Sequence, residues 1–208
     1  MAANDTNGIG LRGVVRLVAL LNLGYFGIEF GVAVAIGSVS LFADSIDFLE
    51  DTSLNLLIAI GLNWTARNRA RLGMVLAGIL LVPSLATIWT AWQKIIAPSV
   101  PAPIALSATG LGALVINLTC AFILASYRHH SGSLTRAAFL SARNDALANL
   151  AIIAAGLVTA LLWRSAWPDL VVGLGIMAMN ADARVRCGPP RGRNMLPRRD
   201  ITVAAPRG

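Results

Sequence analysis

The sequence predicts an all-α membrane protein built as a bundle of six transmembrane helices. Of its 208 residues, 56% are hydrophobic and 13% are charged, against about 25% charged residues in a typical soluble domain. The mean hydropathy is +0.70. Six apolar segments each approach the roughly 20 residues that a helix needs to span a bilayer. These segments are 13–36, 40–62, 72–95, 103–126, 137–163 and 167–183.

The segments divide the chain into three parts. Residues 1–12 are predicted to be a cytoplasmic N-terminal segment, 13–183 a six-helix membrane domain and 184–208 a basic cytoplasmic tail. The tail is rich in Arg, Pro and Gly and has no apolar periodicity, so we expect it to be disordered. The two cysteines, Cys120 and Cys187, make neither a disulfide framework nor a Cys-x-x-Cys metal motif.

Positive charge alternates between successive loops, and this pattern predicts the orientation in the membrane. Arg residues precede the first segment, separate the second from the third and the fourth from the fifth, and follow the sixth. The opposite loops hold only Lys94 and Arg164. By the positive-inside rule, both termini are cytoplasmic in a multi-pass protein of the cell membrane. The net charge of +7 is then a cytoplasmic flank and predicts no nucleic-acid partner.

The second segment carries four acids inside an otherwise apolar run. They are Asp44, Asp47, Glu50 and Asp51. A carboxylate near the bilayer centre costs about 2.5–3.5 kcal/mol on insertion scales, so acids there mark function. At 3.6 residues per turn the three aspartates share one helix face, and Glu50 lies to one side of it. Three acids on one face of a membrane helix predict a bound cation or bound protons.

The fifth segment supplies a matching acid from the opposite direction. The second and fifth segments run antiparallel, and a rise of about 1.5 Å per residue brings Asp51 and Asp145 to similar depths near the midplane. Ser141 and Asn149 share the face of Asp145, and Asn144 lies beside it. Carboxylates four residues apart on one helix can reach one ion. We therefore predict an oxygen-rich divalent cation site from Asp47, Asp51 and Asp145, with Ser141 or Asn144 as the fourth ligand.

Further polar side chains occur inside the other apolar segments. We expect Asn22, Glu29 and Asn117 to line the interior or to hydrogen-bond one another. Arg143 lies at the depth of Asp145 but on another face, where it could pair with Glu50 or Asp44. Two interpretations stay open for the whole set: a cation pathway, or structural polar contacts between helices.

These residues, in this order, resemble the cation diffusion facilitator family of divalent metal transporters over 14–183. The stretch GSVSLFADSIDFLED, with Asn22 and Glu29 before it, is similar to the family's first two helices. Asp47 and Asp51 occupy its paired metal-ligand positions on the second helix. SARNDALANLAIIAAGLV resembles its fifth helix, where the usual pair is His-x-x-x-Asp. Trp167-Pro168-Asp169 resembles the start of its sixth.

The resemblance implies a six-helix bundle, a homodimer, and export of Zn²⁺, Cd²⁺, Co²⁺, Mn²⁺ or Fe²⁺ against inward proton movement. Close carboxylates in a dry site bind protons readily, so an inbound proton can replace an outbound metal. The metal is the transported species, and no other cofactor is expected. Neither a Gly-rich phosphate loop nor a nucleophile–base pair occurs, so we predict a transporter and not an enzyme.

The sequence departs from the family pattern at two places. Ser141 stands where the family has His, and an all-oxygen site suits Mn²⁺ or Mg²⁺ better than Zn²⁺. The basic tail stands where the family has a cytoplasmic ferredoxin-like domain, so we expect any dimer to form through the membrane helices. The alternative hypothesis is a truncated, non-transporting membrane protein that associates with a full-length partner.

Overall fold

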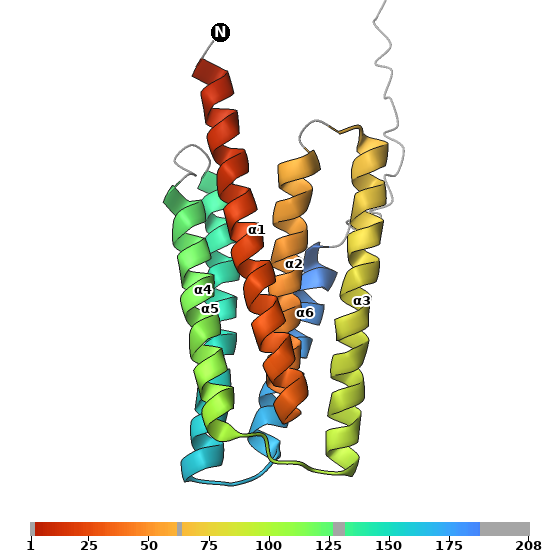
Figure 1. The fold of residues 1–208 in the computed structure, drawn as a ribbon, viewed down its shortest axis with the longest axis vertical. Helices are drawn as coiled ribbons and strands as arrows, with labels where there is room; N and C mark the ends of the chain where they lie inside the picture. Colours follow the sequence, from red (N-terminus) through yellow and green to blue (C-terminus); the bar gives the residue numbers. More distant parts are fainter. Residues whose placement is uncertain (1–2, 62–63, 127–131, 188–208) are drawn as a thin grey trace, which may run out of the picture.

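The computed structural model describes residues 3–61, 64–126 and 132–187. This part of the chain is helical and has no strand. Its six helices run along the long axis of the molecule (Figure 1). They are α1 (Ala3–Ile36), α2 (Val39–Gly61), α3 (Ala66–Ile96), α4 (Pro103–Ser126), α5 (Gly132–Leu161) and α6 (Trp167–Cys187). The predicted six-helix bundle is confirmed.

Two helices extend beyond the apolar segments that predicted them. Helix α1 begins at Ala3, within the predicted N-terminal segment, because no proline interrupts residues 3–12. Helix α6 continues to Cys187, beyond residue 183, where the predicted membrane domain ends. Gly-Pro-Pro follows Cys187 in the sequence, and prolines cannot continue a helix. Residues 188–208 lie outside the described residues.

Helix α2 is the centre of the bundle. It contacts all five other helices, whereas α3 lies at one side and touches only α2 and α6 (Figure 1). Every residue from 38 to 46 is buried, which is the pattern of a helix enclosed on all sides. Asp44 therefore lies in the middle of the fold, whereas the other three acids of α2 are partly buried.

The outer helices present apolar side chains to their surroundings. Exposed large hydrophobic residues include Met74 and Val82 on α3 and Phe122 on α4. Four described helices contain stretches long and apolar enough to cross a membrane, in α1, α3, α4 and α5. Helix α2 is not among them because its four acids interrupt the apolar run. Its acids are instead buried or partly buried among the neighbouring helices, as expected for charged groups in a membrane domain.

Close packing against the start of α2 depends on one glycine of α6. A side-chain Cβ at Gly173 would lie 2.8 Å from the backbone nitrogen of Ser40 and 2.8 Å from the carbonyl carbon of Val39. Neither backbone atom can move without displacing α2. Glycine at this position thus allows the two helices to approach closely enough for the polar contacts described below.

Candidate functional site

The α1–α2 hairpin sets the register of the polar groups. It turns at Gly37, whose φ of 62° is in the left-handed region that favours glycine. Residues equidistant from this turn face each other across the two antiparallel helices. The rings of Tyr25 and Phe48 are 5.1 Å apart, and those of Phe30 and Phe42 are 5.3 Å apart. These two aromatic pairs establish which residues of α1 and α2 oppose one another.

The same register brings polar residues of α1 opposite acids of α2. Glu29 lies opposite Asp44, and both side chains are buried, with 0% and 1% exposure. Asn22 lies opposite Asp51 and is also fully buried. The thiol of Cys120, on α4, contacts the side-chain oxygen of Asn22 at 3.7 Å. The predicted interior placement of Asn22 and Glu29 is therefore what the hairpin produces.

The acids of α2 and α5 share one part of the interior. Asp145 lies within electrostatic range of Asp51 and Asp44, and Asp47 lies within range of Asp145. Asp47, Asp51 and Asp145 are each partly buried. Within the part of the chain that the structure describes, no three His, Cys, Asp or Glu side chains are close enough together to hold one metal ion. The acids of α2 and α5 are thus neighbours in the interior of this conformation.

Asp47 has a partner that the sequence did not predict. The side-chain Nδ2 of Asn180 donates a hydrogen bond to Oδ1 of Asp47 at 2.6 Å. Asn180 lies on α6, for which the acidic pattern of α2 and α5 predicts no site residue. The signal was present, because a lone Asn in an apolar transmembrane segment is expensive unless it faces a polar partner.

The remaining candidates occupy varied environments. Asn149 is fully buried, and its Nδ2 donates to the backbone oxygen of Asp145 at 2.9 Å. Asn117 is buried, whereas the side chain of Asn144 is exposed. Glu50 lines a groove between α2 and α3. The side chains of Ser141 and Arg143 lie outside the described residues, so their predicted roles as ligand and as ion-pair partner stay predictions.

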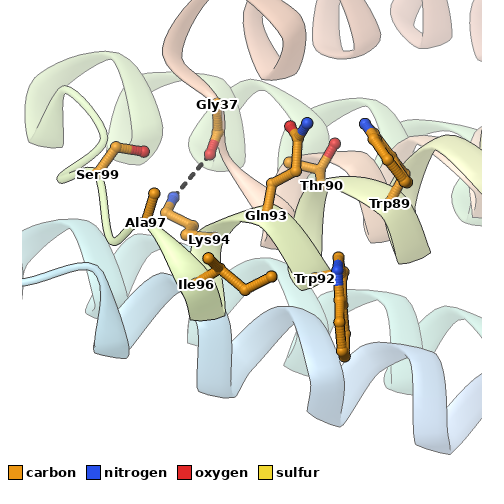
Figure 2. A pocket seen from close by; sticks show the side chains of 9 residues that line it. All are labelled: Gly37, Trp89, Thr90, Trp92, Gln93, Lys94, Ile96, Ala97 and Ser99. Atoms are coloured by element: carbon orange, nitrogen blue, oxygen red, sulfur yellow. Dashed lines mark hydrogen bonds between the residues drawn. The ribbon is translucent and has the colours of Figure 1, made fainter.

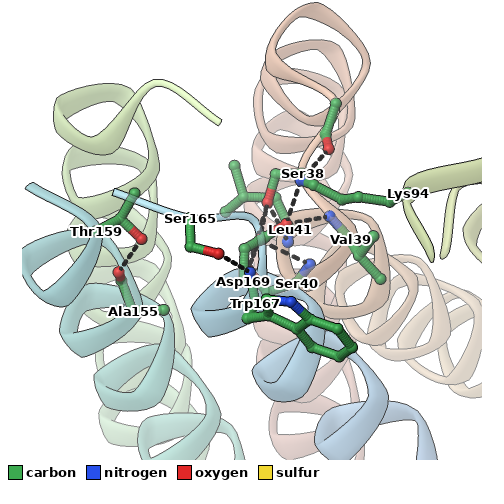
Figure 3. Close-up of polar contacts among 11 residues, drawn as sticks. Ser38, Val39, Ser40, Leu41, Lys94, Ala155, Thr159, Ser165, Trp167 and Asp169 are labelled. Carbon is green, nitrogen blue, oxygen red and sulfur yellow. Dashed lines mark hydrogen bonds and ion pairs between the residues drawn. The ribbon is translucent and has the colours of Figure 1, made fainter. Parts of the chain in front are cut away.

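A second polar cluster joins the ends of three helices around Asp169 (Figure 3). Its carboxylate accepts hydrogen bonds from the hydroxyl groups of Ser38 and Ser40, both at 2.6 Å. The backbone nitrogens of Val39 and Ser40 donate to it at 2.9 and 3.2 Å. Lys94 on α3 forms an ion pair with it at 2.7 Å. We call this cluster the Lys94–Asp169 node.

The node also fixes the α1–α2 turn. Nζ of Lys94 donates to the backbone oxygen of Gly37 at 2.6 Å (Figure 2). A pocket of about 450 Å³ lies beside this contact, lined by the last turns of α3, including Trp89 and Trp92. Lys94 is the only lysine in the sequence, and it is 3% exposed. The node is therefore a structural clamp on α2, α3 and α6, and it already holds its own cation.

Comparison with known families identifies the class of protein. Residues 15–186 match the model of the cation efflux transmembrane domain. Because the match covers most of the chain, this protein belongs to the cation efflux family. No curated protein matches the sequence. The chain is thus a multi-pass membrane protein of a cation efflux transporter family, in agreement with the resemblance inferred from its acids.

Proposed function

We propose that the protein exports a divalent metal ion in exchange for protons, by alternating access around a site formed by Asp47, Asp51 and Asp145. The observation that carries this proposal is the electrostatic contact between acids of α2 and α5 inside the bundle. Acids from two helices in one protein interior have no low-cost structural role. Membership of the cation efflux family supports transport out of the cell.

The ligand chemistry favours a hard cation. Three carboxylates, with the hydroxyl of Ser141 as a fourth donor, provide oxygen only. Oxygen ligands suit Mn²⁺ and Mg²⁺, whereas Zn²⁺ and Cd²⁺ gain more from nitrogen and sulfur. We therefore propose Mn²⁺ as the first ion to test, ahead of Zn²⁺, Cd²⁺, Co²⁺ and Fe²⁺.

Proton exchange follows from the same acids. When the metal leaves, the carboxylates lose the positive charge that neutralised them. Their mutual repulsion then favours proton uptake. The acids are neighbours without forming a chelating cluster, so we propose that binding draws α2 and α5 together. Such movement of helices around a midplane site is the general mode of secondary transporters.

The remaining polar residues would act along the ion path or around the ligands. We assign this role to Glu50, Asn149, Asn22 and Asn117. Asp44 and Glu29 would act on the path of the protons that exchange for the metal. In this proposal the protein works as a homodimer in the cell membrane, with both termini cytoplasmic.

Transport in proteoliposomes tests the function directly. Purified protein is reconstituted with a pH-sensitive dye inside, and Mn²⁺, Zn²⁺, Cd²⁺, Fe²⁺ and Co²⁺ are added in turn. The proposal expects a saturable proton flux with at least one ion, and empty liposomes provide the baseline. If no ion drives a proton flux, the protein is not a metal–proton exchanger, and the hypothesis of a non-transporting partner subunit becomes the better one.

A further inference from the structure

Two buried carboxyl groups lack any hydrogen-bond donor. None of the four side-chain oxygens of Glu29 and Asp44 has a hydrogen-bond partner among the described residues. The nearest hydroxyls on the same helices are engaged elsewhere. The Tyr25 hydroxyl donates to the backbone oxygen of Thr109 at 2.6 Å, and the Ser45 hydroxyl donates to that of Phe42 at 2.8 Å.

The two carboxyl groups face each other across the hairpin. They lie opposite in the α1–α2 register and are close enough to interact directly. The Tyr25–Phe48 pair lies one helical turn to one side of them, and the Phe30–Phe42 pair lies on the other. Helices α1 and α2 and these four rings therefore exclude water from the pair.

The surrounding charges do not neutralise the pair. The described groups that interact with it electrostatically are Tyr25, Asp47 and Asp145, which come from α1, α2 and α5. None of these is a cation. Two ionised carboxylates side by side in such a place would be repelled by each other and by their neighbours.

One arrangement satisfies both groups. If a single proton lies between them, the protonated carboxyl donates a strong O–H···O hydrogen bond to the ionised one. We propose that Glu29 and Asp44 share one proton and form a proton-binding site on the α1–α2 hairpin, separate from the metal ligands. Its use in transport rests on the proposed function, whereas its existence does not.

Amide variants remove the proton while keeping the structure. In Glu29→Gln the amide nitrogen donates to ionised Asp44, and in Asp44→Asn it donates to ionised Glu29. Each variant preserves the shape, one hydrogen bond and the net charge of the pair. Both variants are therefore expected to insert into the membrane and to elute from a size-exclusion column as the wild type does. Two variants are used so that the test still works if one of them does not fold.

Infrared spectroscopy detects the shared proton directly. Metal-free protein in lipid at neutral pH is compared with each variant in the carbonyl-stretch region of protonated carboxylic acids. The proposal expects one such band to be lost in both Glu29→Gln and Asp44→Asn. Asp5→Asn, which alters an acid in the first turns of α1, is the matched control and should keep the band. A spectrum unchanged in both amide variants would overturn the proposal.

Metal binding separates this pair from the metal ligands. Titration with Mn²⁺ should give affinities within about threefold of the wild type for Glu29→Gln and Asp44→Asn, because the net charge is kept. Asp47→Asn should lose binding. If the pair variants lose Mn²⁺ as completely as Asp47→Asn does, the pair belongs to the metal site and the proposal is wrong. A protein that transports no metal yet loses the band in both variants contradicts the proposed function only.

Discussion

Asn180 of α6 donates a 2.6 Å hydrogen bond to the carboxylate of Asp47 on α2. One of the three proposed ligands is therefore occupied by a side chain of the protein in this conformation. A metal ion that approaches this oxygen from the side of Asn180 displaces the amide. Helix α6 thus contributes to the site as a competitor for Asp47, a role that cannot be recognised from α2 and α5 alone.

Replacing Asn180 should strengthen metal binding. In the wild type, metal binding has to break the hydrogen bond from Asn180 to ionised Asp47, and a hydrogen bond to a charged group is worth about 1.5–3 kcal/mol. Asn180→Ala removes this cost, so the affinity for Mn²⁺ should rise by at least about tenfold. Isothermal titration measures this, with exposed Asn144→Ala as the control. A tenfold loss of affinity would instead make Asn180 a ligand.

Removal of a central ligand should abolish transport without preventing insertion. Asp51→Ala is expected to reduce metal-driven proton flux to the level of empty liposomes, because the remaining two acids offer too few ligands to replace the water around a divalent ion. Asp5→Asn, an acid near the start of α1 and far from α5 in the sequence, serves as the control. Wild-type flux in Asp51→Ala would count against the proposed site.

Ion preference should depend on position 141. Ser141→His adds a nitrogen ligand at the proposed fourth position and is expected to shift the binding preference from Mn²⁺ toward Zn²⁺. The measurement is the ratio of Zn²⁺ to Mn²⁺ affinities. Asn144→His adds the same group at an exposed position of α5 and should leave the ratio unchanged. Equal shifts in both variants would show that the imidazole acts without entering the site.

The Lys94–Asp169 node should dominate the stability of its end of the bundle. Breaking a buried ion pair by removing one partner costs about 3–5 kcal/mol, because the other charge stays buried. Lys94→Met and Asp169→Asn should each lower the free energy of unfolding by about this amount. The double variant should lose less than the sum of the two.

Thermal unfolding in detergent measures these changes. Arg164→Met, which removes an exposed cation between α5 and α6, is the control and should leave the midpoint unchanged. Additive losses in the double variant would show that the two side chains act independently.

Two glycines on α6 should respond differently to the same substitution. Gly173→Ala would place a methyl group 2.8 Å from backbone atoms of α2 and is expected to cost about 1–3 kcal/mol. Gly175 has nothing within 4 Å of its would-be Cβ, so Gly175→Ala should be neutral or stabilising by up to about 1 kcal/mol. Equal unfolding midpoints for the two variants would contradict the close contact of α6 with α2.

The sequence by itself determined the six helices and the position of the acids within the second one. Apolar length decides how many segments span a bilayer, and the helical period decides that Asp44, Asp47 and Asp51 share a face. Both are local properties. The helix ends were not determined in this way, because apolarity marks contact with lipid and does not specify where α1 begins or α6 ends.

Only the tertiary structure decided which polar groups meet. Asn180 lies 133 positions from Asp47, and Lys94 lies 75 from Asp169. The pairing of Glu29 with Asp44 follows from a hairpin register that Gly37 sets. In a membrane helix most faces are apolar, so the pattern along the chain does not reveal how each helix is rotated. Rotation is decided by packing, and packing is what brought these partners together.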